Sequence, residues 1–470
     1  MYFCAIKKTI MYRKYLILLV SVISSVCVRS QSPPAYISDS LQGILDSSLP
    51  GSISNSGAVM GVHVPGQWSW YGSSGYAISG MTSGQPASIA HADSKFRVGS
   101  LTKTMVATCI MFLEEDGLLD IEDPIDNYLR NTLIDDTIQS SGTVRIRHLL
   151  NHTSGISNSA DNTTCQQDVL TNPAGSHTLE EAVYCGASLG EIFPPEFAWA
   201  YSNTNYSLLA MIIEAVTGQS YKSYLTQKII TPLGLLNTEV PATNQIAGDH
   251  MGCYWNIGSW VDLTIINPTT YTGWADVVST TEDLNVFFKA LLEGDLVNAA
   301  SLAKMAVIDP ASYDYGLGID FYQVGGVPYY GHYGEVANSS AMIYCELSSS
   351  IAPDGYFISY NFNVQGVDMP NLVDVPVFDL LNSSPLNIYE KVAKSTFTFY
   401  PNPVDDVVTI ELNNSDWAAI KLMDITGNVV EEFTVNTSVY STSLSGLARG
   451  SYLLQIETDD AKEVKKMILK

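Results

Sequence analysis

The chain has 470 residues, of which 46% are hydrophobic and 15% are charged. A chain of this length exceeds one typical domain and predicts two. Acidic residues outnumber basic ones by 48 to 23, which gives a formal net charge of −25. A surface of this sign repels phosphate backbones and anionic lipids, so it argues against nucleic-acid binding and remains compatible with a neutral or zwitterionic substrate.

The first thirty residues differ from the rest of the chain. Four basic residues precede an apolar run over residues 15–28, and Ser30 follows shortly after it. This order is typical of a secretory signal peptide, and the run is shorter than the ~20 residues that a spanning helix needs. We expect residues 1–30 to be removed, which leaves a mature protein with no transmembrane span and a net charge of about −30. A retained anchor is the alternative.

The hydrophobic pattern changes near residue 390. Before it, helical and strand periods are mixed, whereas after it short alternating runs are separated by turns. The alternating runs lie at 407–410, 419–422 and 452–456. We therefore predict a large domain over residues 33–385, a linker over 386–396 and a small β-sandwich over 397–470.

Periodicity and helix-ending glycines place several elements in the large domain. The stretch over residues 102–115 is apolar on nearly every face, which predicts a buried helix. The expected elements, in chain order, are helices over 102–115, from about Asn205 to Gly218 and from after Thr280 to Gly294, and strands over 340–347 and 355–362, with 331–333 as a turn-like approach.

Five cysteines remain after residue 30, an odd number with no Cys-x-x-Cys pair, so no zinc site is indicated. Cys165 and Cys185 share a polar stretch rich in Asn and Thr. They could form a disulfide in an oxidising compartment, and two unpaired small side chains are the open alternative.

Ser100 and Lys103 stand three residues apart at the start of the helix over 102–115, which places both on one face. Burial favours the neutral form of a lysine, and a neutral amine can deprotonate a serine. Gly99 permits a substrate to approach the backbone closely. The spacing alone is weak evidence, because Ser301 and Lys304 repeat it without a matching context.

Two further polar motifs follow. Tyr201 and Asn203 precede the second helix, where a phenol could pass protons and a carboxamide could hold a substrate amide, although Asn203 could be only a helix cap. His332 and Gly334 supply a third polar group near a strand. Each of these spacings recurs elsewhere in the chain, so the weight rests on the ordered set Ser-x-x-Lys, Tyr-x-Asn and His-x-Gly.

This ordered set resembles the family of class C β-lactamases and serine D-Ala-D-Ala carboxypeptidases, and the resemblance covers roughly residues 35–385. It implies an α/β (α+β) fold in which helices flank an antiparallel sheet beside an all-helical subdomain. It also implies a serine hydrolase that needs no metal and no cofactor. The supporting stretches are residues 96–103, 119–129, 147–155, 201–218 and 232–235.

The resemblance implies a role for each matching residue. A D-amino-acid peptide, amide, ester or β-lactam would acylate Ser100, with Lys103 as the general base. Tyr201 would carry protons to the leaving group and to water, and Asn203 would position the substrate. A catalytically inactive, penicillin-binding-like protein that keeps the fold is the alternative, because fold and function can part company.

The third motif departs from the pattern of true β-lactamases. His332 replaces their lysine, as it does in carboxypeptidase-like and esterase-like relatives. After Gly334 the family often continues with glycine, whereas this chain has Glu335, which we place with Gly334 among the substrate-binding residues. The backbone N–H groups of Ser100 and Glu335 would hold the oxyanion. A carboxylate at this position would disfavour an anionic substrate terminus.

The tail resembles the C-terminal sorting domain of type IX secretion cargo, over about residues 397–470. This resemblance implies handling by the type IX secretion machinery, removal of the tail, and release or attachment at the outer-membrane surface of a Gram-negative bacterium. A carbohydrate-binding or spacer sandwich is the alternative. The motifs that carry the resemblance are Phe-Tyr-Pro-Asn-Pro at 399–403, Asp-Ile-Thr-Gly at 424–427, Leu-Ala-Arg-Gly-Ser-Tyr at 447–452 and the basic end at 465–470.

Overall fold

The chain divides into two compact units, Met1–Asn382 and Ser383–Lys470, in a computed structural model. The predicted signal peptide (1–30) and linker (386–396) lie outside the residues that the structure describes. Within the described ranges, no helix is long and apolar enough to cross a membrane. The described residues are 31–49, 56–80, 87–130, 137–312, 314–324, 327–346, 349–382, 397–400, 404–412, 415–424, 428–458 and 462–470.

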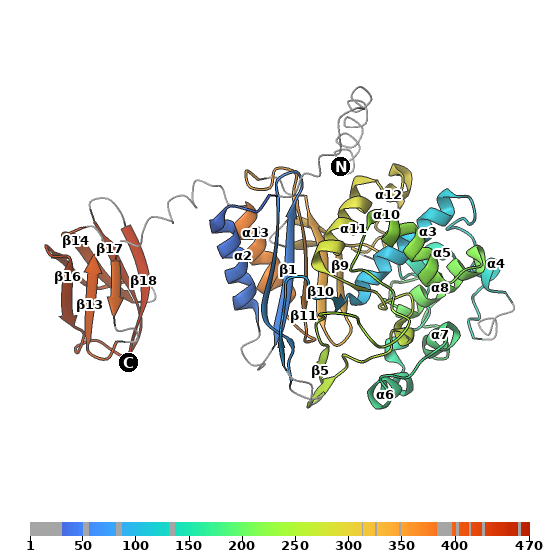
Figure 1. The fold of residues 1–470 in the computed structure, drawn as a ribbon, viewed down its shortest axis with the longest axis horizontal. Coiled ribbons are helices and arrows are strands. Elements are labelled where there is room, and N and C mark those ends of the chain that lie inside the picture. The colour runs from blue at the N-terminus through green and yellow to red at the C-terminus, as the bar shows by residue number, and fades with distance from the viewer. Residues whose placement is uncertain are drawn as a thin grey trace, which may run out of the picture. The chain divides into compact units, whose positions relative to one another are not determined.

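A seven-stranded antiparallel sheet forms the frame of the first unit, in the order β3-β2-β1-β11-β10-β9-β8 (Figure 1). Strand β1 comes early in the chain and pairs with β11, which comes late. The strands are β1 (Gly57–Val64), β2 (Trp68–Ile78), β3 (Ser88–Ile89), β8 (Asp320–Val324), β9 (Val327–Glu335), β10 (Ser339–Cys345) and β11 (Tyr356–Phe362).

Helices cover both faces of this sheet. Helices α2 (Ala35–Ser48) and α13 (Val375–Asn382) lie together on one face, and α11 (Thr281–Glu293) packs on the other (Figure 1). The apolar residues of α2 recur at helical spacing and are buried, because one stripe of the helix faces the sheet. This stripe consists of Ile37, Leu41 and Leu45.

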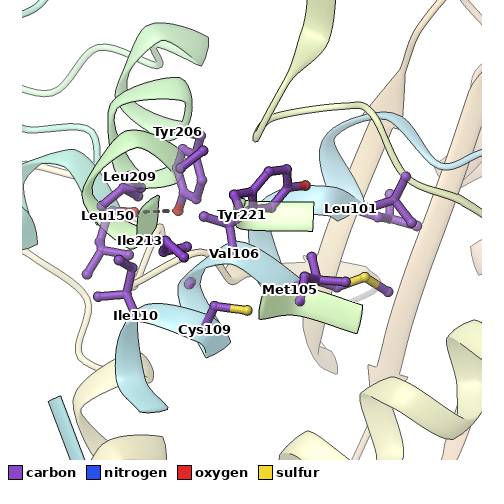
Figure 2. Packing of buried hydrophobic residues seen from close by; sticks show 14 of the residues in the cluster. Leu101, Met105, Val106, Cys109, Ile110, Leu150, Tyr206, Leu209, Ile213 and Tyr221 are labelled. Atoms are coloured by element: carbon purple, nitrogen blue, oxygen red, sulfur yellow. Dashed lines mark hydrogen bonds between the residues drawn. The ribbon is translucent and has the colours of Figure 1, made fainter. Parts of the chain in front are cut away.

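The helical region beyond α11 is centred on α3 (Thr102–Glu115), in which eleven of fourteen residues are buried. Helix α8 (Asn203–Thr217) packs against it, with Tyr206 and Leu209 facing α3 (Figure 2). The phenol of Tyr206 donates to the Leu150 carbonyl (2.8 Å), which ties α8 to α5 (Ile146–Leu150). The Ser-x-x-Lys helix is thus embedded in the core from its first residue to Leu113.

Shorter elements connect the sheet to the helical region. They are the helices α4 (Asp126–Leu129), α6 (Thr163–Thr171), α7 (Leu179–Ala187), α9 (Tyr221–Leu225), α10 (Thr231–Leu233) and α12 (Ala299–Met305), the strands β4 (Phe96–Arg97), β5 (Tyr254–Asn256), β6 (Trp260–Asp262) and β7 (Val278–Ser279), the 3-10 turns η1 (Gly99–Leu101), η2 (Ser159–Asp161) and η4 (Pro268–Tyr271), and the π-helical turns η3 (Thr226–Ile230) and η5 (Pro370–Asp374).

The predicted fold class and the three predicted helices are confirmed, and strands β10 and β11 lie where alternation placed them. Gly218 and Gly294 end α8 and α11 in the left-handed conformation. The prediction of a turn-like approach over residues 331–333 is wrong. These residues belong to β9, because each pairs with a residue of β10 in unbroken register.

Cys165 on α6 and Cys185 on α7 form a disulfide, so the first of the two alternatives for these cysteines holds. The other cysteines of the described residues, Cys109, Cys253 and Cys345, are free and buried. Helix α6 has no fully buried residue. The disulfide is therefore a main attachment of α6 to the remainder of the unit.

The second unit consists of two small antiparallel sheets around its own apolar core, consistent with the predicted sandwich. The three runs predicted as strands lie within β13, β14 and β17. One sheet has the order β12-β13-β16 and the other β15-β14-β17-β18, with β12 (Phe397–Tyr400), β13 (Val407–Leu412), β14 (Ala418–Asp424), β15 (Val429–Val435), β16 (Val439–Ser443), β17 (Gly450–Glu457) and β18 (Lys462–Leu469).

Candidate active site

Ser100 lies in the η1 turn that opens α3, where the backbone approaches the end of β9. Gly99 has φ +61°, in the left-handed region, and an ideal Cβ on it would lie 2.7 Å from the backbone nitrogen of Glu335. A side chain at residue 99 would push β9 away. Glycine therefore allows the backbone at Ser100 and the backbone at Glu335 to lie side by side.

Lys103 is completely buried one turn after Ser100. Its Nζ donates to Ser100 Oγ (2.8 Å) and to the carbonyl of Trp274 (3.2 Å), and it lies 4.9 Å from the centre of the Tyr201 ring. Burial holds the pKa of Lys103 well below its usual value, and the nearby carboxylate of Asp320 opposes this shift in part. A desolvated lysine with a lowered pKa can be neutral and accept a proton.

Tyr201 and Asn203 lie at the start of α8. Tyr201 makes a hydrogen bond with Ser100, and burial raises the pKa of its phenol well above the usual value. Asn203 is the first residue of α8 and not its cap, since Ser202 occupies the cap position. The Asn203 N–H donates to Asn158 Oδ1 (3.0 Å), while its own Oδ1 is buried with no hydrogen-bond partner among the described residues.

A pocket of about 430 Å³ opens beside Ser100. It brings together five of the seven residues that the sequence predicted for the site, while Lys103 lies beneath Ser100 and His332 lies deeper. Its wall also contains residues that the sequence did not indicate. The lining residues are Ser100, Tyr201, Asn203, Trp274, Tyr333, Gly334, Glu335, Met369 and Pro370.

His332 is buried behind Tyr201 and does not line the pocket; the centres of the two rings are 6.4 Å apart. Its Nδ1 donates to the carbonyl of Tyr333 (2.5 Å), and its Nε2 accepts from the Tyr315 phenol (3.0 Å). Burial, with Lys103 nearby, lowers its pKa to about 3. His332 is therefore a neutral imidazole, at the position where the resemblance predicts a lysine in true β-lactamases.

Sequence reasoning missed several groups that surround the site. Asp320 begins β8, and its carboxylate lies 3.8 Å from His332 Nδ1. Burial and the neighbouring Asp314 raise the pKa of Asp320 to about 7, although Lys103 opposes the shift. Trp274 provides both a wall of the pocket and a carbonyl for Lys103. Single residues in unrelated segments carry no spacing signal that could have revealed them.

Glu335 stands at the mouth of the pocket, and Gln365 Nε2 donates to its Oε2 (3.1 Å). Tyr333, two residues earlier on the same strand, donates to the buried Asp374 Oδ2 (2.5 Å). Its phenol is thus held by the protein. Among the described residues, no group of three or more His, Cys, Asp or Glu side chains could hold a metal ion.

Comparison with known proteins assigns the chain to a family. The family described as Beta-lactamase matches residues 47–369. The chain belongs to the beta-lactamase family. The family described as Secretion system C-terminal sorting domain matches residues 398–470, so the second unit is a sorting domain of the kind associated with type IX secretion.

Among curated proteins, this family member is similar to penicillin-binding proteins. It is 31% identical over 242 residues to one from Bacillus subtilis (strain 168), covering 49% of this chain and 51% of the relative. It is 29% identical over 261 residues to penicillin-binding protein 4 of Amycolatopsis lactamdurans, covering 52% of this chain and 66% of the relative. The chain thus spans about half to two thirds of the length of these relatives.

Among solved structures, the beta-lactamase family member is similar to a D-stereospecific amidohydrolase from Streptomyces sp., with 27% identity and a TM-score of 0.63 over 72% of this chain and 98% of the other. The D-amino acid amidase from Ochrobactrum anthropi SV3 shares its fold, with 24% identity and a TM-score of 0.61 over 74% of this chain and 99% of the other. The family and these neighbours support a serine hydrolase type of enzyme.

Proposed function

We propose that the protein is a secreted serine hydrolase that works through an acyl-enzyme at Ser100. The observation that carries this proposal is the 2.8 Å hydrogen bond between Lys103 Nζ and Ser100 Oγ beside the pocket, with the lysine fully buried. A lysine kept neutral by burial can take the serine proton, which makes the hydroxyl a nucleophile.

In the acylation step, Lys103 accepts the proton of Ser100 as Oγ attacks the carbonyl carbon of the substrate. The negative charge on the carbonyl oxygen is stabilised by the backbone N–H groups of Ser100 and Glu335, and one such donor has been worth ~3–4 kcal/mol in an enzyme where it was removed. Tyr201 donates a proton to the leaving amine or alcohol as its bond to carbon breaks. The proton that Lys103 took from Ser100 then passes to Tyr201, which restores the neutral lysine and the neutral phenol.

In the deacylation step, water attacks the ester of Ser100, and Tyr201 takes the proton of this water as it passes its own phenol proton to Lys103. The bond between the acyl carbon and Ser100 Oγ then breaks, and Lys103 supplies the proton that Oγ needs. The acid product leaves. His332 does not touch the substrate in this scheme. It is a neutral imidazole that accepts a hydrogen bond from the Tyr315 phenol and lies behind Tyr201. Its role in this scheme is to position the Tyr201 phenol, and it exchanges no proton.

The polar groups of the pocket favour an amide or ester of a D-amino acid over a peptide with a free carboxyl terminus. The Asn203 Oδ1 is a buried acceptor without a donor, which suits a substrate N–H. The Glu335 carboxylate repels an anionic terminus. The name of the Streptomyces relative, a D-stereospecific amidohydrolase, supports the stereochemistry.

We also propose that residues 1–30 are a signal peptide, that the mature hydrolase domain ends near residue 385, and that the sorting domain is removed after export to the cell surface or beyond. The match to a sorting domain supports this route. Intact-mass analysis of the extracellular protein tests it: a mass that includes residues 397–470 contradicts removal of the tail.

The decisive experiment for the hydrolase is intact-mass analysis after incubation with a p-nitrophenyl ester or a β-lactam. We expect an adduct on the wild type, none on Ser100→Ala, and an unchanged adduct on Ser301→Ala, which alters the second Ser-x-x-Lys pair. Turnover of the ester marks a hydrolase, whereas a stable adduct without turnover supports a penicillin-binding protein. The absence of any adduct on the folded wild type contradicts both.

Substrate preference is tested on matched amides and free acids of D-aminoacyl peptides. We expect kcat/KM to favour the amide in the wild type and this preference to shrink in Glu335→Gln. Glu346→Gln removes the same charge from the far end of β10 and should leave the preference unchanged, because Glu346 follows the strand end that pairs with Tyr329 and not with Glu335. A wild type that prefers the free acid contradicts the role given to Glu335.

A further inference from the structure

His152 holds both backbone neighbours of Tyr201. The N–H of Ala200 donates to the His152 carbonyl (3.1 Å), and the N–H of Ser202 donates to its Nδ1 (3.2 Å). The imidazole also lies against the Tyr201 ring, with the two ring centres 4.3 Å apart. His152 alone therefore forms hydrogen bonds with the backbone on both sides of Tyr201 and contacts one face of its ring.

Two features of His152 oppose folding. His152 has φ +63°, which is left-handed and unfavourable for a residue with a side chain. Since Nδ1 accepts a hydrogen bond, Nε2 carries the proton of the neutral ring, and Nε2 is buried with no hydrogen-bond partner among the described residues. An apolar side chain would fill the same space without this burden, so core filling does not explain a histidine here.

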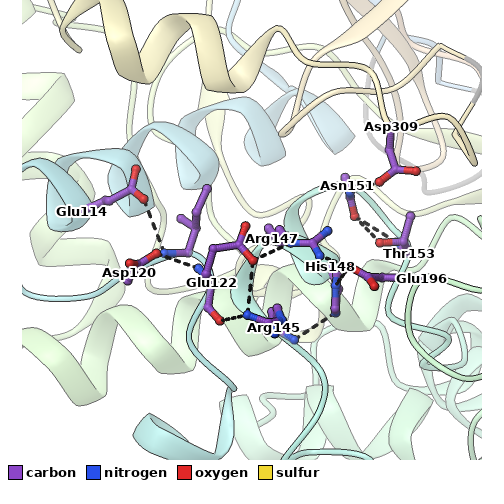
Figure 3. Close-up of polar contacts among 11 residues, drawn as sticks. Glu114, Asp120, Glu122, Arg145, Arg147, His148, Asn151, Thr153, Glu196 and Asp309 are labelled. Atoms are coloured by element: carbon purple, nitrogen blue, oxygen red, sulfur yellow. Dashed lines mark hydrogen bonds and ion pairs between the residues drawn. The ribbon is translucent and has the colours of Figure 1, made fainter.

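The residues on either side of His152, Asn151 and Thr153, are joined by hydrogen bonds of their own (Figure 3). Asn151 Oδ1 accepts from both the N–H (3.1 Å) and the hydroxyl (2.7 Å) of Thr153. Glu196 pairs with Arg147 and with His148 Nε2 (3.0 Å). Its N–H donates to the Thr153 carbonyl (2.9 Å), which joins the segment around Glu196 to the segment around His152. The two segments meet on either side of His152.

His152 does not itself take part in the chemistry. It is fully buried, it does not line the pocket, and burial together with Lys103 lowers its pKa, which keeps the ring neutral. Its contacts run to Tyr201 and its neighbours and to the aromatic rings of Tyr206 and Tyr315 behind them. Its Nδ1 also lies 3.4 Å from the side-chain amide nitrogen of Asn205. Among these neighbours Tyr201 is the one with a hydrogen bond to Ser100, so we expect the main effect on the reaction to pass through Tyr201.

We propose that His152 is a positioning residue that fixes the Tyr201 phenol against Ser100. The inference rests on the proposed function, since it assumes that Tyr201 transfers protons. The ring contact sets the plane of the phenol, and the two backbone hydrogen bonds set where the Tyr201 side chain leaves the chain. A displacement of about 1 Å at a reacting group can lower a rate ~10²-fold, so loss of these contacts should appear in the rate constant for acylation.

The test compares His152→Asn with His63→Asn in the full chain. Asparagine tolerates the left-handed conformation and keeps a short acceptor near Ser202, but it removes the ring from Tyr201. His63 on β1 is the control, since its imidazole is half-buried and shares a hydrogen bond with the Ser69 hydroxyl (2.8 Å), but it belongs neither to the site nor to the segments that hold His152. Single-turnover acylation by a p-nitrophenyl ester, KM and Tm are measured for each.

For His152→Asn we expect acylation to slow ~10–100-fold with KM within about twofold of wild type. His63→Asn should acylate within about twofold of wild type, even where its Tm falls by as much as that of His152→Asn. Equal acylation by folded His152→Asn and wild type would overturn the proposal, as would losses in both variants that follow Tm alone.

Hydrogen exchange at the Ser202 amide provides a readout that does not depend on activity. His152→Phe keeps a ring but has no acceptor for this N–H, so exchange should be faster than in wild type, and this variant also serves if His152→Asn does not fold. An unchanged exchange rate of the Ser202 amide in His152→Phe would contradict the hydrogen bond from this amide to His152. If the wild type forms no acyl adduct at all, the proposed function fails, while the exchange comparison still decides whether His152 holds this segment.

Discussion

Lys103 Nζ lies 2.8 Å from Ser100 Oγ, and no part of the lysine side chain is exposed to solvent. The pair closes one turn at the start of α3, and the pocket opens on the serine side only. The base of the proposed acylation step is therefore shielded from bulk water, while its partner Ser100 lines the pocket. Removal of either group tests this relationship directly.

Lys103→Arg should lower the acylation rate ~10²–10⁴-fold, because arginine stays protonated and cannot act as a base. Stopped-flow release of p-nitrophenol measures this rate. Lys304→Arg is the matched control from the second Ser-x-x-Lys pair, where the lysine is half exposed and forms an ion pair with Glu114 (2.8 Å). Comparable rates in Lys103→Arg and wild type would exclude Lys103 as the base.

Gly99→Ala should lower acylation about 10²-fold, because the new Cβ would meet the Glu335 nitrogen at 2.7 Å and separate the two oxyanion donors. Gly117→Ala is the control, since Gly117 has a similar φ of +69° but open space around its Cβ. Both variants carry the same kind of backbone strain. Equal acylation rates in the two variants would show that strain, and not the contact with β9, sets the effect.

Asp374 should make the protein less stable as the pH rises. Burial raises its pKa from 3.8 to about 7, although the phenols of Tyr333 and Tyr360 donate to its oxygens. The folded state therefore keeps a proton that the unfolded state loses between about pH 4 and 7, and the contribution of Asp374 is full below pH 4 and lost as the pH passes 7. In this window the free energy of unfolding should fall by about 1.4 kcal/mol per pH unit from this group.

Asp374→Asn removes that titration, so the variant should gain stability relative to wild type from pH 4.5 to pH 7.5. Urea unfolding at the two pH values measures the difference. A difference that stays constant between them would show that the Asp374 carboxyl does not hold a proton in the folded state.

The disulfide between Cys165 and Cys185 should stabilise the first unit by about 3 kcal/mol, as expected for a loop of about this length. Because α6 has no fully buried residue, the loss should be local. Limited proteolysis of a Cys165→Ser/Cys185→Ser variant should cut first within residues 163–171. Cleavage elsewhere at the wild-type rate, with α6 still protected, would contradict this account.

The sequence predicted the parts of the site that are close together along the chain. Ser100 and Lys103 share one helical turn, and Tyr201 and Asn203 lie at the start of α8, so each pair forms a short motif. Because each spacing recurs elsewhere in the chain, the order of the motifs was needed to identify both pairs. Local spacing failed for His152, Tyr315 and Asp320, because each is alone in its segment and only the tertiary fold brings it near Tyr201 or Lys103. His152 carried one usable signal, since it lies in the stretch 147–155 that supported the family resemblance.

The extended strand over residues 331–333 was also missed. Its two glycines, Gly331 and Gly334, weaken the alternation on which strand prediction depends. In the folded chain they are required by close neighbours: a Cβ on Gly331 would lie 2.1 Å from the Met342 carbonyl, and one on Gly334 would lie 2.3 Å from the Val98 carbonyl. The close packing of β9 against Met342 and Val98 thus requires glycines, and these glycines make the strand difficult to predict from the sequence.

The order of strands in the sheet has a consequence for how the protein is made. Strand β11 lies in the middle of the sheet between β1 and β10. Its Phe362 pairs with Ala58, and most of the sequence of the first unit lies between these two residues. Contacts so distant along the chain form slowly, because a long loop must close first. A chain synthesised from its N-terminus therefore exposes unpaired edges of β1 and β10 until residue 362 has emerged. The middle of the sheet therefore stays incomplete until nearly all of the first unit has been synthesised.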